Sequence, residues 1–284
     1  DPGVEVVGAP DRARTLVDVL DWHVERHPDR PYLHLYEDAD SPVDLSHADM
    51  GRTSARVAAG LADRGLEKGG TVALLLPTGR DYFHSFFGTI LAGGVAVPLY
   101  PPVRMSQLED HLARQVRILQ NAGVTALVTF DEAKTVARVL RSRVPTLKHV
   151  VTVAELLDSG AAAPRPVLSP EDVAFLQYTS GSTGTPKGVI LSHANLLANM
   201  RAMVQAIDAG PRDVFVSWLP LYHDMGLIGA CLATLYAAVP VALMSPLAFL
   251  SRPERWLWAV HRHGGTISAA PNFAYDLCVQ RASD

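Results

Sequence analysis

The chain has 284 residues, of which 48% are hydrophobic and 19% are charged, and its formal net charge is −4. This length and apolar content are typical of a globular protein with a large buried core. A weakly acidic chain without a basic cluster is not expected to bind nucleic acid, because that function needs clustered Lys and Arg to neutralise phosphates. The two cysteines, Cys231 and Cys278, lack CxxC spacing, which favours a reducing compartment, with the cytoplasm as the expected location, and no structural zinc.

The amino-terminal part predicts a helix, a hairpin and a second helix. Asp1 to Asp11 is polar and lacks the basic start and apolar run of a signal peptide, so we expect no secretory leader there. The expected elements are a capped helix that begins at Thr15-x-x-Asp18 and ends before Pro28, a strand over 32–36, its hairpin partner over 43–45, and a helix that begins at Ser46 or Asp49 and ends at Gly65.

From Thr71 onward the sequence alternates between apolar strands and helices. Strands are expected over 72–76, 95–99, 126–130 and 149–153, and helices over 79–92, 107–122 and 131–141. Strands that are apolar along their whole length, each followed by a helix, predict a parallel sheet that is covered on both faces. Ser159 to Pro170 is rich in proline and alanine, so we expect a surface connection there.

An uncharged stretch runs from Met225 to Ser251, which is long enough to span a membrane. Glycines and prolines interrupt it, so we interpret it as a buried helix over 224–237 followed by a buried strand over 239–244, in a protein that does not span the membrane. Around it the alternation continues, with helices expected over 194–206, 253–263 and 272–282 and strands over 214–219 and 266–270.

The most unusual composition lies between two strands expected over 173–178 and 188–191. This segment carries the hydroxyl residues Thr179, Ser180, Ser182, Thr183 and Thr185, the glycines Gly181, Gly184 and Gly188, and the cation Lys187. Backbone N–H groups exposed by glycine, hydroxyl donors and a mobile ammonium group together favour binding of a polyphosphate. The Walker A pattern GxxxxGK[ST] fails, because it needs glycine at Pro186 and Ser or Thr at Gly188. A flexible surface linker is the alternative, but a linker would not need the lysine.

Tyr-Thr-Ser-Gly-Ser-Thr-Gly-Thr-Pro-Lys-Gly (178–188) resembles the phosphate loop of the adenylate-forming superfamily. Trp-Leu-Pro-Leu-Tyr-His-Asp-Met-Gly-Leu-Ile-Gly (218–229) and Ala-Pro-Asn-Phe-Ala-Tyr-Asp-Leu-Cys (270–278) are similar to its fatty acyl-AMP ligase branch. The resemblance implies an α/β fold with two mostly parallel sheets flanked by helices, layered αβαβα, as the N-terminal part of an AMP-binding domain. It further implies two sub-lobes, one formed by about 66–185 and the other by about 12–65 with 189–284.

The resemblance also implies a function for the whole protein. A long-chain fatty acid would react with ATP and Mg²⁺ to give acyl-AMP and pyrophosphate, and the acyl group would pass to the phosphopantetheine arm of an acyl carrier protein in a polyketide, lipopeptide or lipid synthase. The implied phosphate contacts are Thr179, Ser180, Gly181, Ser182, Thr183, Gly184 and Lys187. The implied acyl contacts are His223, Met225, Gly226, Asn272, Phe273 and Tyr275. His223 and Lys187 are the expected catalytic residues.

Several alternatives stay open on the sequence. His223-Asp224 also fits a surface turn with a helix-capping aspartate, and Phe273 and Tyr275 also fit ordinary core aromatics. An acyl-CoA ligase of the same superfamily, or a nucleotide-binding fragment without chemistry of its own, are the rival functions. The family's adenine, ribose, metal-binding and catalytic-lysine motifs are expected beyond Asp284, including the main Mg²⁺ ligand, so the chain by itself is expected to be inactive.

Overall fold

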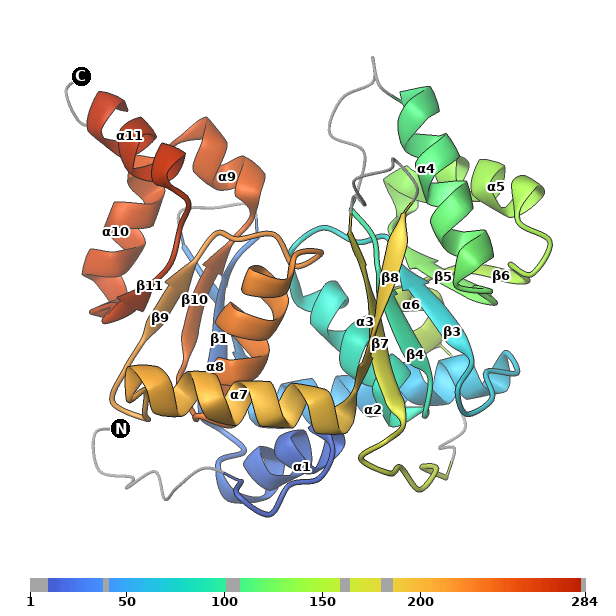
Figure 1. Ribbon diagram of the computed structural model, residues 1–284, viewed down its shortest axis with the longest axis horizontal. Helices are drawn as coiled ribbons and strands as arrows, with labels where there is room; N and C mark the ends of the chain where they lie inside the picture. Colours follow the sequence, from blue (N-terminus) through green and yellow to red (C-terminus); the bar gives the residue numbers. More distant parts are fainter. Residues whose placement is uncertain (1–9, 38–40, 101–107, 159–163, 180–185, 282–284) are drawn as a thin grey trace. The chain divides into compact units, whose positions relative to one another are not determined.

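The computed structural model describes residues 10–37, 41–100, 108–158, 164–179 and 186–281. It contains two mostly parallel sheets with helices packed on them, which confirms the predicted α/β class (Figure 1). Two compact units result: the first comprises Asp1–Ala13, Asp18–Asp49 and Leu196–Asp284, and the second comprises Arg14–Val17 and Met50–Asn195.

The second unit is built on a six-stranded sheet of order β6-β5-β3-β4-β7-β8. Its strands are β3 (Thr71–Leu74), β4 (Val95–Pro98), β5 (Ala126–Thr129), β6 (His149–Thr152), β7 (Val173–Thr179) and β8 (Lys187–Ser192). All neighbours pair in parallel except β7 and β8, which are antiparallel. Its helices are most of α2 (His47–Asp63), α3 (Arg80–Leu91), α4 (Leu108–Asn121), the 3₁₀ turn η2 (Asp131–Ala133), α5 (Lys134–Arg143) and α6 (Val153–Leu157).

The central strands of this sheet are buried along their whole length, as their uninterrupted apolar sequence predicts. Every residue of β4 and of β5 is buried, and the register aligns Val72 of β3 with Ala96 on one side and Ala126 on the other. Helix α3 is buried from Tyr82 to Leu91, so it forms core rather than surface. A strand buried on both faces is the usual consequence of helices covering both sides of a parallel sheet.

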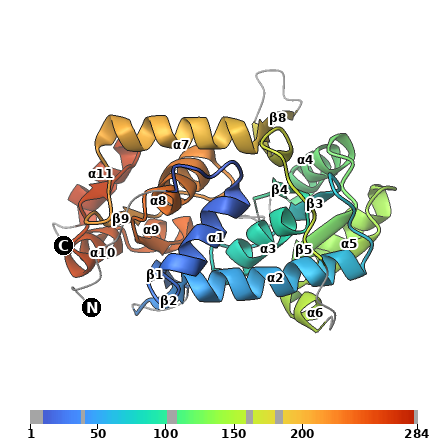
Figure 2. The same ribbon diagram turned by 90° about the horizontal axis from the view of Figure 1, so that it is seen from below.

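The first unit is built on a five-stranded sheet of order β11-β9-β10-β1-β2. Its strands are β1 (Pro31–Tyr36), β2 (Val43–Ser46), β9 (Phe215–Ser217), β10 (Val241–Met244) and β11 (Ile267–Ser268). Only the predicted β1–β2 hairpin is antiparallel among its pairs. Its helices are α1 (Leu16–Arg26), α7 (His193–Ile207), the π-helix η3 (Met225–Leu232), α8 (Ala233–Tyr236), α9 (Pro246–Ser251), α10 (Glu254–His263) and α11 (Asn272–Arg281). Helices α7 and α8 lie side by side in both views (Figures 1 and 2).

The uncharged stretch from Met225 to Ser251 forms η3, α8, the buried strand β10 and the short helix α9. The predicted order of buried helix and buried strand is therefore confirmed, although the first part is a π-helix. Within the described ranges, no helix combines the length and the apolarity needed to cross a membrane.

Candidate functional site

The β7–β8 hairpin carries the two ends of the hydroxyl- and glycine-rich loop. Tyr178 pairs with Gly188 and Thr179 pairs with Lys187, so the last ladder pair lies directly at the root of the loop. The side chains of Thr179 and Lys187 are both exposed. The loop leaves the carboxyl end of β7, which runs parallel to β4, and ligands of α/β sheets bind preferentially at that edge. The expected phosphate contacts Ser180, Gly181, Ser182, Thr183 and Gly184 lie outside the described residues.

The root of this hairpin is fixed by packing on Tyr178. Its hydroxyl donates a 2.5 Å hydrogen bond to Oδ1 of Asn121 at the end of α4, and partial burial raises the pKa of the phenol. The ring lies across Gly188 on the neighbouring strand, where an added Cβ would be only 3.0 Å from the ring carbon Cζ. At the other end of β7, Asp172 forms a 2.7 Å ion pair with Lys68. The strand pair is therefore anchored at both ends, and Thr179 and Lys187 have defined positions.

In the first unit, His223 and Asp224 lie between β9 and η3. Their side chains are 64% and 67% exposed, and Nδ1 of His223 is 2.7 Å from Oδ1 of Asp224. The same carboxylate oxygen accepts a 2.7 Å hydrogen bond from the Met225 amide and so caps η3. Asp224 thus combines the predicted capping role with orientation of the imidazole, whose Nε2 is the nitrogen turned away from the carboxylate.

Gly226 allows a close approach of two backbone segments beneath His223. A Cβ at Gly226 would lie 2.2 Å from the Pro220 carbonyl oxygen, so no other residue fits without moving that loop. The His223 amide donates to the same carbonyl oxygen at 3.1 Å, and the Leu227 amide donates to the His223 carbonyl at 2.9 Å. This network fixes the backbone of the turn that carries His223 and Asp224 at the start of the helix.

An apolar pocket of about 360 Å³ opens beside this turn. Its walls come from α7, β9, η3, α8 and the strand β11, and they comprise Met203, Val204, Ala206, Ile207, Ala209, Phe215, Met225, Gly229, Ala233, Thr234, Ala237, Val239, Ile267, Ser268 and Ala269. Along η3 and α8 the lining changes from the half-exposed Met225 (50%) to the buried Ala233 and Ala237 (5% and 4%), whereas Ile207 on the α7 side is 59% exposed.

The polar side chains in the pocket lining are already engaged. The Thr234 hydroxyl donates to the carbonyls of Ala230 and Cys231, and the Ser268 hydroxyl donates to Val216 and accepts from Trp256. The remaining lining residues are aliphatic, aromatic, thioether or glycine. Such a lining favours a hydrocarbon ligand, because a polar ligand would lose hydrogen bonds to water without replacement.

Side chains distant in sequence hold the π-helix η3 and the adjoining helix α8, which form one wall of the pocket. The Tyr32 hydroxyl donates a 2.5 Å hydrogen bond to the Cys231 carbonyl, and the His23 imidazole donates from Nε2 to the Leu235 carbonyl at 2.6 Å. His23 stacks on His47 with ring centroids 4.5 Å apart. Burial is the main cause that lowers the pKa of His23 to about 3 and that of His47 to about 4, so both rings are neutral at pH 7.

The second expected acyl-contact segment lies at the start of α11. Phe273 is 48% exposed and meets Trp218 edge to face, with centroids 5.9 Å apart. Tyr275 is 50% exposed and lies 5.4 Å from the Trp256 ring. Asn272 is exposed at the first position of the helix. The structure therefore brings Phe273 close to the loop that follows β9, and Met225 is the expected acyl-contact residue that also lines the pocket.

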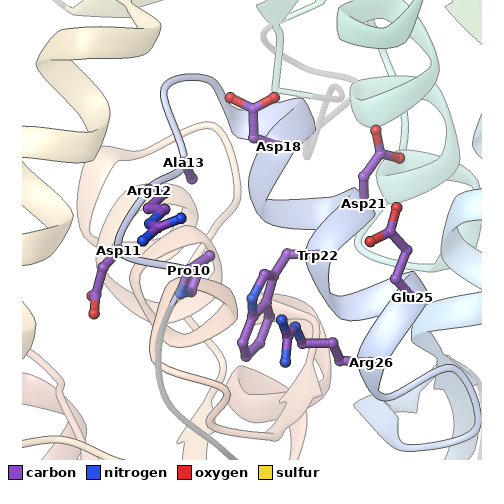
Figure 3. Close-up of a pocket in the computed structure, with 9 residues that line it drawn as sticks. All are labelled: Pro10, Asp11, Arg12, Ala13, Asp18, Asp21, Trp22, Glu25 and Arg26. Carbon is purple, nitrogen blue, oxygen red and sulfur yellow. The ribbon is translucent and has the colours of Figure 1, made fainter.

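A second hollow, of about 610 Å³, lies against α1 (Figure 3). It is larger, but its lining is charged: Asp18, Asp21 and Glu25 follow one side of α1, and the Arg26 guanidinium lies 5.5 Å from the Trp22 ring centroid. A lining with four carboxylates and two guanidinium groups does not suit an alkyl chain. The larger volume of this hollow is therefore no reason to choose it as the pocket for an alkyl chain.

Sequence reasoning missed most of the pocket. It identified Met225, but not the α7 wall, and not Gly229, Ala233 and Ala237, which follow Met225 at intervals of four residues. That spacing of small residues was the available signal. Over the described part of the chain, no group of three or more His, Cys, Asp or Glu could hold a metal ion.

Comparison with protein families matches residues 20–284 to the AMP-binding enzyme family. The long-chain-fatty-acid–AMP ligase FadD26 of Mycobacterium tuberculosis is 41% identical over 223 residues, covering 76% of this chain and 38% of FadD26. The medium-chain-fatty-acid–[acyl-carrier-protein] ligase JamA of Moorena producens is 31% identical over 95% of this chain and 46% of its own length.

Comparison with solved structures also finds fatty acyl-AMP ligases. The fatty acid AMP ligase of Legionella pneumophila superposes with a TM-score of 0.87 at 30% identity, over 98% of this chain and 47% of the other. A fatty acyl-adenylate ligase of L. pneumophila in complex with acyl adenylate and pyrophosphate gives 0.86 at 31% identity, over 96% and 47%. The chain thus spans about half the length of these relatives.

Proposed function

Because the chain belongs to the AMP-binding enzyme family, we propose that the whole protein containing it activates a fatty acid with ATP. A carboxylate oxygen of the acid forms a bond to the α-phosphorus, the bond from that phosphorus to the β-phosphate bridging oxygen breaks, and pyrophosphate leaves with the electron pair. The products are acyl-AMP and pyrophosphate. The observation that carries this proposal is the apolar pocket whose mouth, at Met225, directly follows His223 and Asp224.

Different residues bind the nucleotide and the acid. The loop from Thr179 to Lys187 binds the β- and γ-phosphates, and Lys187 compensates the negative charge that grows on the leaving pyrophosphate. His223 lies beside the acyl carboxylate and the α-phosphate, in an orientation set by Asp224. Phe273 and Tyr275 flank the approach of the acid, with Gly226 and Asn272 at its edges.

The alkyl chain occupies the apolar pocket beyond Met225. Burial of each methylene group in such a lining contributes about 0.8 kcal/mol, so a chain of several methylenes supplies most of the affinity for the acid. The hydroxyls of Thr234 and Ser268 are bound within the protein and therefore do not compete for the substrate. This arrangement supports an acid with an apolar chain over a polar one such as an amino acid.

Mg²⁺ enters with the nucleotide as the MgATP complex. Among the residues that the structure describes, no set of three or more acidic, His or Cys side chains could hold a metal ion. The acceptor of the acyl group is the phosphopantetheine thiol of an acyl carrier protein, as the name of the relative JamA supports. Transfer to coenzyme A instead would identify an acyl-CoA ligase.

Exchange of labelled pyrophosphate into ATP, driven by a fatty acid, tests the proposal in the full-length protein. Lys187→Ala should reduce the exchange at least about a hundredfold, the usual effect of removing one preorganised group at a transferring phosphate. Lys148→Ala is the matched control, because Lys148 is an exposed lysine at the opposite, amino-terminal edge of the sheet, directly before β6.

Two results would refute this assignment. Undiminished exchange in Lys187→Ala would remove the phosphate loop from the reaction, and absence of acid-dependent exchange in the wild-type protein would favour a nucleotide-binding protein without this chemistry. Comparing coenzyme A with a holo-carrier protein as acceptor then decides the second half-reaction.

A further inference from the structure

We propose that Gly229 sets the length of the alkyl chain that the apolar pocket accepts. This inference rests on the proposed function, since it takes a fatty acid as the occupant of the pocket. Four lining residues, Met225, Gly229, Ala233 and Ala237, follow one another at intervals of four along η3 and α8. Their exposure falls from 50% at Met225 to 5% at Ala233 and 4% at Ala237, so they mark successive depths from mouth to floor.

Gly229 lies between the mouth and the buried floor of this pocket. A Cβ built on Gly229 meets a single atom within 4 Å, the Cγ of Met225 at 3.9 Å. The space beside Gly229 is therefore open pocket rather than packed protein. The opposite walls come from Met203, Val204 and Ile207 of α7 and from Ile267 of β11. A side chain at position 229 would extend between these walls and close the passage to the deeper part.

The neighbouring glycine shows that this openness is specific to one position. A Cβ at Gly226 would lie 2.2 Å from the Pro220 carbonyl oxygen, so glycine is needed there for a close contact between two backbone segments. Gly229 has no such contact, and its small size instead keeps the passage to Ala233 and Ala237 wide. Lengthening the side chain at 229 should shorten the accepted acid without disturbing the turn at His223.

The test compares wild-type and Gly229→Leu full-length protein with saturated acids from butanoic to hexadecanoic in acid-dependent pyrophosphate exchange. We expect unchanged kcat/KM for the shortest acids and a loss for long acids of about fourfold for each methylene that no longer enters, the value of burying one methylene. The loss should appear mainly in KM, because the alkyl chain contacts are lost in ground state and transition state alike.

Three further variants keep the test decisive. Gly229→Ala, which fits the open space, should give a smaller shift in the same direction, even if the leucine variant fails to fold. Ala237→Leu adds bulk at the floor and should affect only the longest acids that the wild-type protein accepts. Ala202→Leu on the exposed side of α7 is the matched control and should leave the profile unchanged.

The failures of the two proposals are distinguishable. If the wild-type protein shows no exchange with any fatty acid, the proposed function is wrong. If the wild-type protein is active and folded Gly229→Leu and Gly229→Ala proteins keep the wild-type chain-length profile, the activity stands and the role of Gly229 is refuted. A uniform loss across all acids would also contradict it, because closure of the pocket at mid-depth spares short chains.

Discussion

Replacing Gly226 with alanine should disable the turn that carries His223 and Asp224 without removing any functional side chain. The added methyl group would lie 2.2 Å from the Pro220 carbonyl oxygen, where ordinary contacts are 3.4–4 Å. The methyl carbon is bonded directly to the Cα of residue 226, and the oxygen belongs to the Pro220 backbone, so neither atom can rotate away. The β9–η3 loop must shift by roughly 1 Å, and a displacement of that size at a reacting group costs about a hundredfold in rate.

The same overlap predicts a loss of stability. Overpacking of a close contact typically costs about 1–3 kcal/mol, which we expect as a lower free energy of unfolding of Gly226→Ala in urea titrations. Activity is measured by acid-dependent pyrophosphate exchange at a temperature where the variant is folded. The hydrogen bonds from the amides of His223 and Leu227 to Pro220 and His223 are the contacts expected to distort.

Gly229→Ala is the matched stability control, three residues further along the same π-helix. Its methyl group enters open space, so relief of the glycine entropy cost should raise the free energy of unfolding by up to about 1 kcal/mol. Opposite signs for the two substitutions would support the described turn. Equal stability of Gly226→Ala and wild type, with an unchanged exchange rate, would refute the close approach of Gly226 to Pro220.

Two further predictions concern stability. Because burial lowers the pKa of His23 to about 3 and that of His47 to about 4, from 6.5, the unfolded protein binds more protons below pH 6.5. The stabilisation is complete above pH 6.5 and is lost as the pH falls toward the lower values. The free energy of unfolding should therefore drop by about 3 kcal/mol between pH 7.5 and 5.5, about half of it from each histidine. A drop of the same size in His23→Phe would show that His23 does not contribute its half. In α6, Thr152 and Glu155 form a capping box, with hydrogen bonds of 3.3 and 2.8 Å, so Thr152→Ala should cost about 1 kcal/mol in urea unfolding. Ser142→Ala on the exposed side of α5 should change stability by less than about 0.5 kcal/mol, and an equal loss in both variants would speak against the cap.

The regular parts of the fold follow from patterns that act over short distances. The apolar segments 72–76, 95–99 and 126–130 correspond to β3, β4 and β5, because full burial of a parallel strand requires an uninterrupted apolar sequence. Gly123, which directly follows the helix predicted over 107–122, has φ of +60°, a conformation that glycine adopts without strain. These features depend on neighbouring residues, which a sequence shows directly.

Features that depend on distant partners were not predictable. The Cys231 carbonyl of the π-helix accepts a hydrogen bond from Tyr32, and the Leu235 carbonyl of α8 accepts one from His23, with both donors about two hundred residues away. One local feature was also missed: Val153 was expected to end a strand, but the capping box of Thr152 and Glu155, a pattern that the sequence itself carries, makes it the first residue of α6. The predicted first residue of the helix over 107–122 lies outside the described residues. The pocket combines α7, η3, α8 and β11, so its walls become apparent only when the chain is folded.

The fate of the carboxylate oxygen tests the proposed reaction most directly. The full-length protein is incubated with ATP, an acyl acceptor and a fatty acid labelled with ¹⁸O in its carboxylate, and the phosphate-containing products are analysed by mass spectrometry. Attack of the carboxylate on the α-phosphorus predicts one labelled oxygen in AMP and unlabelled pyrophosphate. Label in inorganic phosphate, with ADP as the nucleotide product, would contradict adenylation and indicate attack on the γ-phosphorus instead.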